Sequence, residues 1–287
     1  MTAQCVADLR CALGEGPCWD PRDGRLWWVD IVGRKVHWFE PVTGERGTVD
    51  PGDQITALGL RRAGGFVAAT AAGAGIFDPL SGRFTLRFPT QNEPANNRSN
   101  DGNVGADGSF WFGSMHNEAT ERSGAVFQVK PDWSGRAVVR DWGITNTLRT
   151  SLDGKQLYLA DSLEQTLYRY DINNEGLGGQ QVFAHTRGQA ATPDGSAVDC
   201  EGYVWNAQWD GWRIVRYAPD GSIDRIIPMP VQCPTSCSFG GSDLKTLFVT
   251  SARDGLSPQQ LEGQPQAGGL FALSVDVAGA PPLYFEG

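Results

Sequence analysis

Residues 13–31 read LGEGPCWDPRDGRLWWVDI and contain a pattern that recurs along the whole chain. Glu15 stands eleven positions ahead of the apolar, aromatic-rich strand candidate that begins at Leu26, and the turn signal PRDG at 21–24 separates the two. Five further strand candidates, beginning at Phe66, Phe110, Leu157, Val204 and Leu247, each follow a residue with a side-chain oxygen by ten or eleven positions. The six residues that share this position are Glu15, Thr56, Asn100, Asn146, Asp194 and Ser236.

The repeat spacing of roughly 40 to 50 residues is typical of a propeller blade of four strands. No amphipathic pattern at helical period extends over 12 residues, and 37 Gly and 17 Pro interrupt the chain. The sequence therefore predicts an all-β fold, a six-bladed β-propeller with four-stranded antiparallel blades, formed as a single domain over residues 1–287. Most of the ten Trp and thirteen Phe are expected in the core between blades.

The charge and the N-terminal residues exclude several classes of function. A formal net charge of −9 disfavours nucleic acid and anionic membranes as partners, since both require a basic surface. The N-terminus has neither the basic start nor the apolar run of a signal peptide, so we expect a cytoplasmic protein with six free cysteines. No protein partner is implied.

Common catalytic and metal motifs are missing from the sequence. It contains no GxSxG, Walker or HExxH motif and only three histidines. Cys233 and Cys237 have no second cysteine or histidine pair to complete a tetrahedral zinc site. The segment DINNEG at 171–176 imitates the start of a calcium loop, but Val182 stands where the bidentate glutamate should be, so we interpret it as a turn.

The recurring oxygen-bearing residues are the best candidates for chemistry. Equivalent positions of a closed ring of blades face one axis, where the oxygens of Glu15, Asn100, Asn146 and Asp194 would converge. Two carboxylates and two carboxamides suit one divalent metal ion such as Ca, Mg, Mn or Fe(II), and Zn is also open. The alternative is that Asn and Asp begin these strands because they cap turns.

Several motifs resemble the senescence marker protein/regucalcin/gluconolactonase family, and they span essentially the whole chain. They are LGEGPCWDP at 13–21, NNRSNDGNVGADGSFWFGSM at 96–115, GITNTLRTSLDGKQLYLADS at 143–162, TPDGSAVDCEGYVWNA at 192–207 and TSARDGLSPQQL at 250–261. This resemblance implies a six-bladed propeller that binds one divalent metal in its central channel and hydrolyses sugar lactones. It also implies that Glu15, Asn146 and Asp194 are the metal ligands.

The same resemblance implies roles for the residues around the metal. Arg98, Asn100 and Asp101 form the substrate-side cluster, and Glu118 matches a position that contacts sugar hydroxyls. Asp194 would also accept the proton of the attacking water, since a carboxylate has a second oxygen. An Asp before Gly102 also suits a simple turn, so that role of Asp101 stays open.

Other features leave alternatives open. His116 either touches substrate or covers the channel mouth. Residues 147–149, Thr-Leu-Arg, stand where the family often has glycine or small apolar residues, which leaves open how Asn146 presents its oxygen.

The expected substrate is a small-molecule aldonolactone, with xylono- or arabinonolactone preferred and gluconolactone close behind. A pocket discriminates one hydroxymethyl group by only about 1 to 3 kcal/mol. A broader esterase or phosphotriesterase using the same metal, and a non-catalytic calcium-binding regulatory propeller, are the alternative functions.

Overall fold

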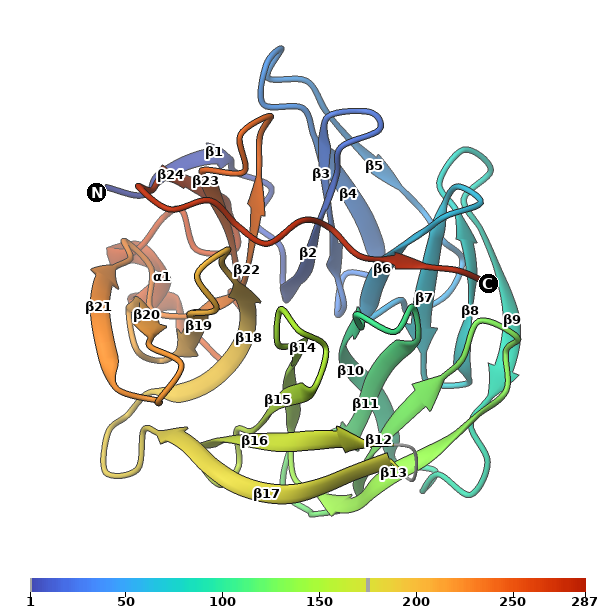
Figure 1. Cartoon of the computed structure of the whole chain (residues 1–287). Helices are drawn as coiled ribbons and strands as arrows, with labels where there is room; N and C mark the ends of the chain where they lie inside the picture. Colours follow the sequence, from blue (N-terminus) through green and yellow to red (C-terminus); the bar gives the residue numbers. More distant parts are fainter. Residues whose placement is uncertain (1, 174–175) are drawn as a thin grey trace.

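Six blades, each of four antiparallel strands, form a closed ring (Figure 1). The computed structural model describes residues 2–173 and 176–287. Blade 1 contains β2 (Gly14–Asp20), β3 (Arg25–Asp30), β4 (Lys35–Phe39) and β5 (Arg46–Val49). Blade 2 contains β6 (Ala57–Arg61), β7 (Phe66–Thr70), β8 (Gly73–Asp78) and β9 (Arg83–Pro89). Blade 3 contains β10 (Asn97–Val104), β11 (Phe110–His116), β12 (Gly124–Val129) and β13 (Gly135–Trp142).

The second half of the chain repeats this arrangement. Blade 4 contains β14 (Thr145–Thr150), β15 (Gln156–Asp161), β16 (Thr166–Asn173) and β17 (Gly176–His185). Blade 5 contains β18 (Thr192–Val198), β19 (Val204–Trp209), β20 (Arg213–Tyr217) and β21 (Ile223–Pro228). Blade 6 contains β22 (Pro234–Gly240), β23 (Thr246–Ser251), β24 (Leu270–Ser274) and β1 (Gln4–Ala7). The predicted six-bladed all-β propeller is confirmed.

The six aromatic-rich segments form the second strand of each blade, as predicted. These strands are almost wholly buried because neighbouring blades cover both faces, which explains why their sequences are continuous apolar runs rather than alternating ones. Aromatic pairs fill the space between blades. Trp27 of blade 1 packs on Phe66 of blade 2 with ring centroids 5.3 Å apart, and Trp205 of blade 5 meets Phe239 of blade 6 at 5.6 Å.

Both ends of the chain contribute to the ring closure. The N-terminal β1 pairs antiparallel with β24 and completes blade 6, so the first strand of the sequence lies in the last blade. The C-terminal segment crosses one face of the ring, and β25 (Tyr284–Phe285) pairs parallel with β6 as a fifth strand of blade 2 (Figure 1). Four strands per blade were predicted; this added strand is the one departure among the described residues.

One short helix interrupts the strand pattern. Helix α1 (Pro258–Gly263) begins with a capping box, in which the Ser257 hydroxyl accepts from the Gln260 backbone and the Gln260 side chain accepts from the Ser257 backbone. No helix within the described residues is long and apolar enough to cross a membrane. The turn predicted at 171–176 includes residues 174 and 175, which lie outside the described residues.

Candidate active site

The six recurring oxygen-bearing residues all lie on or directly before the innermost strands of the ring. Five belong to inner strands and Thr56 directly precedes β6, and the exposed fractions of all six are 7% or less. In five blades the pairing between the first and second strands is irregular at or beside this residue. Such β-bulges redirect a side chain out of the regular alternation. The bulges therefore explain how Glu15, Asn100, Asn146 and Asp194 can line one cavity from within otherwise regular sheets, whereas Thr56 and Ser236 do not line it.

Buried aspartates hold the chain as it enters two of these strands. Asp30, the last residue of β3, accepts hydrogen bonds from the backbone N–H groups of Ala12 and Leu13 at 2.9 and 3.0 Å. Asp161, the last residue of β15, does the same for Gly143 and Ile144 at 3.1 and 3.2 Å. The residues bonded in this way lie two and three positions before Glu15 and Asn146. Equivalent aspartate–backbone hydrogen bonds therefore fix the backbone that leads into both of these residues.

The carboxyl groups of Glu15 and Asp194 lie close to each other, although their strands belong to different blades. Each is buried, and each shifts the pKa of the other. Burial raises the pKa of Glu15 to about 8, with the negative charge of Asp101 as the next cause. Burial, followed by the charges of Glu15 and Asp101, also raises the pKa of Asp194 well above its usual range. The nearby charge of Arg98 lowers the pKa of Glu15 and so opposes this rise only in part.

A chain of hydrogen bonds orients the Asn100 and Asn146 side chains, which could offer neutral oxygens to a metal beside this carboxyl pair. The half-buried Arg98 donates from Nη1 to Asn100 Oδ1 at 2.6 Å. Asn100 Nδ2 donates to Asn146 Oδ1 at 3.0 Å, and Asn146 Nδ2 donates to Ser162 Oγ at 2.9 Å. Ser162 Oγ donates in turn to the backbone oxygen of Pro193, the residue before Asp194, at 2.6 Å. The two amide side chains are thus locked in orientation between blades 3, 4 and 5.

These residues form part of the wall of a cavity of about 610 Å³. The cavity is lined by Leu13, Glu15, Arg98, Asn100, Met115, Asn117, Glu118, Ala119, Ile144, Asn146, Ser162, Leu163, Gln165, Thr192, Asp194, Trp209, Asp210 and Asp254. Its volume lies within the range of small-molecule sites. The structure brings together Glu15, Arg98, Asn100, Asn146 and Asp194, and it places the exposed Glu118 at the rim.

Two of the sequence candidates do not line this cavity. Asp101 is buried behind it, where Oδ1 accepts from the backbone N–H of Gly102 at 2.7 Å and Oδ2 has no hydrogen-bond partner. His116 is also buried, and Nδ1 contacts the Thr120 hydroxyl at 3.2 Å. Asp101 acts on the site through its charge, whereas His116 supports the loop that carries Glu118.

Sequence analysis did not identify Asp210 and Asp254, which add two carboxylates to the cavity wall. Burial lowers the pKa of Arg98, and the negative charge of the nearby Asp254 opposes this effect. Asp254 occurs within the TSARDGLSPQQL motif, so that motif was an available signal. Asp210 stands at a turn with φ of 60°, and nothing in its local sequence distinguishes it from an ordinary turn aspartate.

The segment after Asn146 has an unusual backbone. Thr147 has φ of 55°, a left-handed conformation that a β-branched residue rarely adopts, and Gly16 has the same φ directly after Glu15. The buried Thr147 hydroxyl bonds to the backbone oxygen of Asp194 and to Ser196 Oγ. Thr147 therefore links the backbone beside Asn146 in blade 4 to the backbone of Asp194 in blade 5. Arg149 points elsewhere and lines a separate cavity of about 120 Å³ under the C-terminal segment.

The donor set of the channel fits a hard divalent cation. Glu15 and Asp194 supply two buried carboxyl groups in contact, and Asn100 and Asn146 add carboxamides within hydrogen-bond reach of each other. Among the described residues of this cavity wall, the half-buried Arg98 is the single cationic one. Oxygen donors of this kind suit Ca, Mg, Mn or Fe(II), and a divalent charge would remove the mutual repulsion of the carboxylates.

The chain is similar to known proteins over nearly its whole length. The chain is 34% identical over 288 residues to a 6-deoxy-6-sulfogluconolactonase from Pseudomonas putida, which covers 99% of this chain and 98% of that relative. It is 33% identical over 293 residues to regucalcin from Gallus gallus, with the same coverage. A solved structure of regucalcin from Agrobacterium tumefaciens, described as a calcium-binding protein, matches with a TM-score of 0.94 at 28% identity and covers 99% of this chain and 97% of that one.

A family model described as SMP-30/Gluconolactonase/LRE-like region matches residues 13–253, which include every metal-ligand candidate. The family predicted from the sequence motifs is confirmed, and with it the enzyme class of a sugar lactonase at the level of the family. The chain belongs to the SMP-30/gluconolactonase/LRE-like family.

Proposed function

We propose that this protein is a metal-dependent hydrolase that opens an aldonolactone to the sugar acid. The observation that carries the proposal is the contact between the buried Glu15 and Asp194 carboxyl groups at the wall of a cavity of about 610 Å³. Carboxyl groups with raised pKa values cluster at functional sites. The names of the relatives, a sulfogluconolactonase and a calcium-binding regucalcin, support both parts of the proposal.

Glu15, Asn146 and Asp194 would hold the metal, with Asn100 beside them. When bound there, a divalent cation balances two carboxylates and polarises the lactone carbonyl. The all-oxygen donor set favours Ca, Mg, Mn or Fe(II) over a metal that prefers sulfur. Of these, calcium has the additional support of the regucalcin structure.

The chain's own residues would bind the lactone, orient it and move the proton. Asp194 would accept the proton of the attacking water, and the Thr147 hydroxyl, which donates to the Asp194 backbone oxygen, would hold this residue in place. The Arg98 guanidinium, fixed by Asn100, donates hydrogen bonds to the sugar ring substituents. Glu118 at the rim accepts hydrogen bonds from sugar hydroxyls.

The charge of the cavity favours a neutral lactone. Five carboxyl residues and one cationic residue line it, so the net charge stays negative even with a divalent ion bound. We therefore infer a neutral pentono- or hexonolactone, with xylono- and arabinonolactone preferred and gluconolactone next. A substrate that carries its own negative charge is disfavoured by this wall.

The decisive experiment measures acid release with a pH indicator on freshly prepared xylono-, arabinono- and gluconolactone. The protein is first treated with chelator and then reloaded separately with Ca, Mg, Mn, Zn or Fe(II). We expect activity to disappear on chelation and to return with a divalent metal. Full activity in metal-free protein would refute the proposal.

The same experiment separates the alternative functions. Aryl esters and organophosphates in the panel identify a broader esterase or phosphotriesterase if they are hydrolysed faster than the lactones. Tight metal binding without acceleration of any lactone over its spontaneous hydrolysis would indicate a regulatory propeller.

A further inference from the structure

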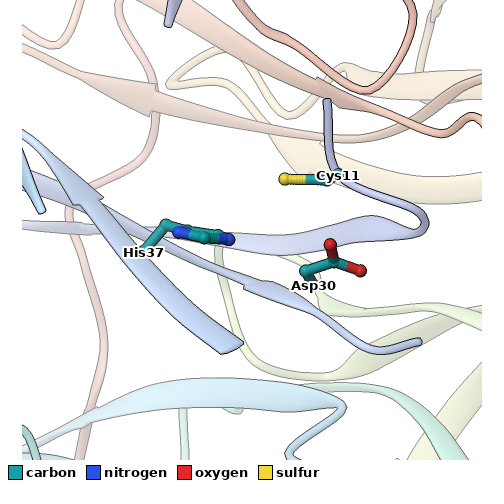
Figure 2. A group of neighbouring side chains, drawn as sticks. All are labelled: Cys11, Asp30 and His37. Carbon is teal, nitrogen blue, oxygen red and sulfur yellow. The ribbon is translucent and has the colours of Figure 1, made fainter. Parts of the chain in front are cut away.

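A second group of possible metal ligands lies outside the channel. Cys11, Asp30 and His37 are all buried, and one ligand atom of each lies within 4.8 Å of the other two. Cys11 belongs to the loop before β2, Asp30 ends β3, and His37 is in β4. Figure 2 shows the three side chains as neighbours, with the His37 ring on one side and Cys11 and Asp30 on the other. None of the three lines the substrate cavity.

A comparison between two blades shows what is unusual about Asp30. Asp161 holds the same backbone position in blade 4, and Arg122 Nη1 balances its charge at 3.1 Å. Within the described part of the chain, Asp30 has no lysine, arginine or histidine nitrogen within ion-pair distance. A buried carboxylate normally requires a cationic partner or a metal. In blade 1 the neighbours of Asp30 are instead the Cys11 thiol and the His37 imidazole.

Two of the three side chains, His37 and Asp30, are already oriented by other groups. His37 Nδ1 contacts the Thr48 hydroxyl at 2.9 Å, which leaves Nε2 for a ligand. Asp30 accepts three backbone N–H bonds, from Ala12, Leu13 and Gly33, and a carboxylate has further lone pairs to offer. Such outer contacts are what a metal site requires to hold its ligands in position.

The arrangement does not suit a cysteine nucleophile. In a catalytic Cys-His-Asp group the two ring nitrogens of the histidine serve the cysteine and the aspartate, whereas here Nδ1 faces Thr48. The Cys11 side chain is 2% exposed, and burial raises the pKa of its thiol to about 12. A thiol of this kind is unreactive toward a substrate.

We propose that Cys11, Asp30 and His37 form a binding site for Zn(II) or a similar transition-metal ion, separate from the channel. A thiolate, an imidazole and a carboxylate are the ligand types that zinc accepts in proteins. The sulfur donor distinguishes this site from the channel, whose donors are all oxygens and which favours harder ions. Lys35, the nearest lysine to His37 in sequence, is neutralised by Asp50 at 2.6 Å. The ion would link the loop before β2 to β3 and β4 and so stabilise blade 1.

The test uses Co(II) as a spectroscopic substitute for zinc in the full chain. Only a site with sulfur gives a thiolate-to-cobalt charge-transfer band, so the channel does not contribute to this signal. We expect one equivalent of Co(II) to produce the band in the unaltered protein and in the Asp194→Asn variant, and Zn(II) to displace it. Because Asp194→Asn alters the channel site, a band that persists in this variant tests the Cys11 site independently of the proposed lactonase function.

Three variants test whether the cobalt band arises from the site formed by Cys11, Asp30 and His37. Cys11→Ser should abolish the band, His37→Gln should weaken Co(II) binding at least about tenfold, and the control Cys18→Ser should leave the band unchanged. Circular dichroism checks that each variant is folded, and His37→Gln decides the matter if Cys11→Ser is not. Absence of the band in the unaltered protein, or an equal band in a folded Cys11→Ser or His37→Gln variant, would overturn the proposal.

Discussion

The carboxyl groups of Glu15 and Asp194 lie close enough together for each to shift the pKa of the other, although β2 and β18 belong to different blades. This proximity depends on the closure of the whole ring, since no single blade contains both groups. It also creates an electrostatic problem for the metal-free protein, because two buried carboxylates repel each other. The raised pKa values of both groups are the physical result.

Removing one of these charges should abolish activity without unfolding the protein. Asp194→Asn keeps the shape of the side chain but removes the proton acceptor and half of the negative charge available to a metal. We expect kcat/KM on the best lactone to fall at least about a hundredfold, as is usual for loss of a central electrostatic group. Isothermal titration should show weaker metal binding, while Asp276→Asn, in an exposed pair with Arg225, should behave like the unaltered protein.

The metal-free protein should become less stable as the pH rises from about 5 to 8. The Glu15 pKa is 4.5 in the unfolded chain and about 8 in the fold, so the folded state binds more protons in this range. The free energy of unfolding therefore decreases with pH, by up to about 1.4 kcal/mol per pH unit for each proton. Below pH 4.5 and above pH 8 the contribution of Glu15 should be constant.

Urea unfolding in the presence of chelator at several pH values measures this slope. The double variant Glu15→Gln/Asp194→Asn is the control, and its slope should be clearly smaller. Saturating divalent metal should raise the stability most at high pH. A slope of the opposite sign in the metal-free protein would show that the two carboxyl groups are ionised in the fold.

Thr147 offers a test of positioning without touching the proposed ligands. Its φ of 55° costs an estimated 1 to 3 kcal/mol for a β-branched residue, and its hydroxyl bonds to the Asp194 backbone. Thr147→Val keeps the branching but loses the hydroxyl, so kcat should fall several-fold. Thr147→Ser keeps the hydroxyl and should retain activity with equal or greater stability. Equal kcat values for the two variants would mean that the hydroxyl does not position Asp194.

The sequence predicted most of this fold because each blade repeats one local pattern. Glu15 and Asp194 could be placed on a common axis from their distance to the strand that follows, since that distance fixes the register within a blade. The contacts made by the two ends of the chain could not be predicted in this way, because no repeated spacing in the sequence marks them. Tyr284 of β25 pairs with Leu60 of β6, and a strand of two residues is too short to show a period in the sequence.

The secondary sites were harder to predict for a related reason. Asp101 belongs to the same motif as Asn100, but the bulge in β10 turns it away from the cavity, and motif position does not specify this direction. Cys11 and His37 are far apart in sequence and adjacent only because β4 lies beside the loop before β2. Their proximity is a property of the folded blade rather than of any sequence motif.

Arg216 should be important for stability and not for catalysis. It donates from Nε and Nη2 to Asp199 Oδ2 at 2.9 and 2.7 Å, and Asp199 is completely buried. Arg216→Met leaves this carboxylate without its partner, which typically costs about 3 to 5 kcal/mol. Arg225→Met, in the neighbouring strand, breaks an exposed pair and should cost less than about 1 kcal/mol. Urea unfolding compares the two, and kcat per folded molecule should be unchanged in both.

The last prediction concerns the charge of the substrate. Glu118, Asp210 and Asp254 line the cavity along with the Glu15–Asp194 pair, and Arg98 is the single cationic residue among the described lining. We expect gluconolactone to be hydrolysed with a kcat/KM at least about tenfold higher than a gluconolactone with a sulfonate at carbon 6, equivalent to about 1.4 kcal/mol. Added salt should reduce this difference, because it screens charges near the open rim. Asp254→Asn should reduce it as well, whereas Asn117→Asp should increase it. A preference for the sulfonated lactone would show that the wall charges do not select the substrate, and that Arg98 binds its anionic group instead.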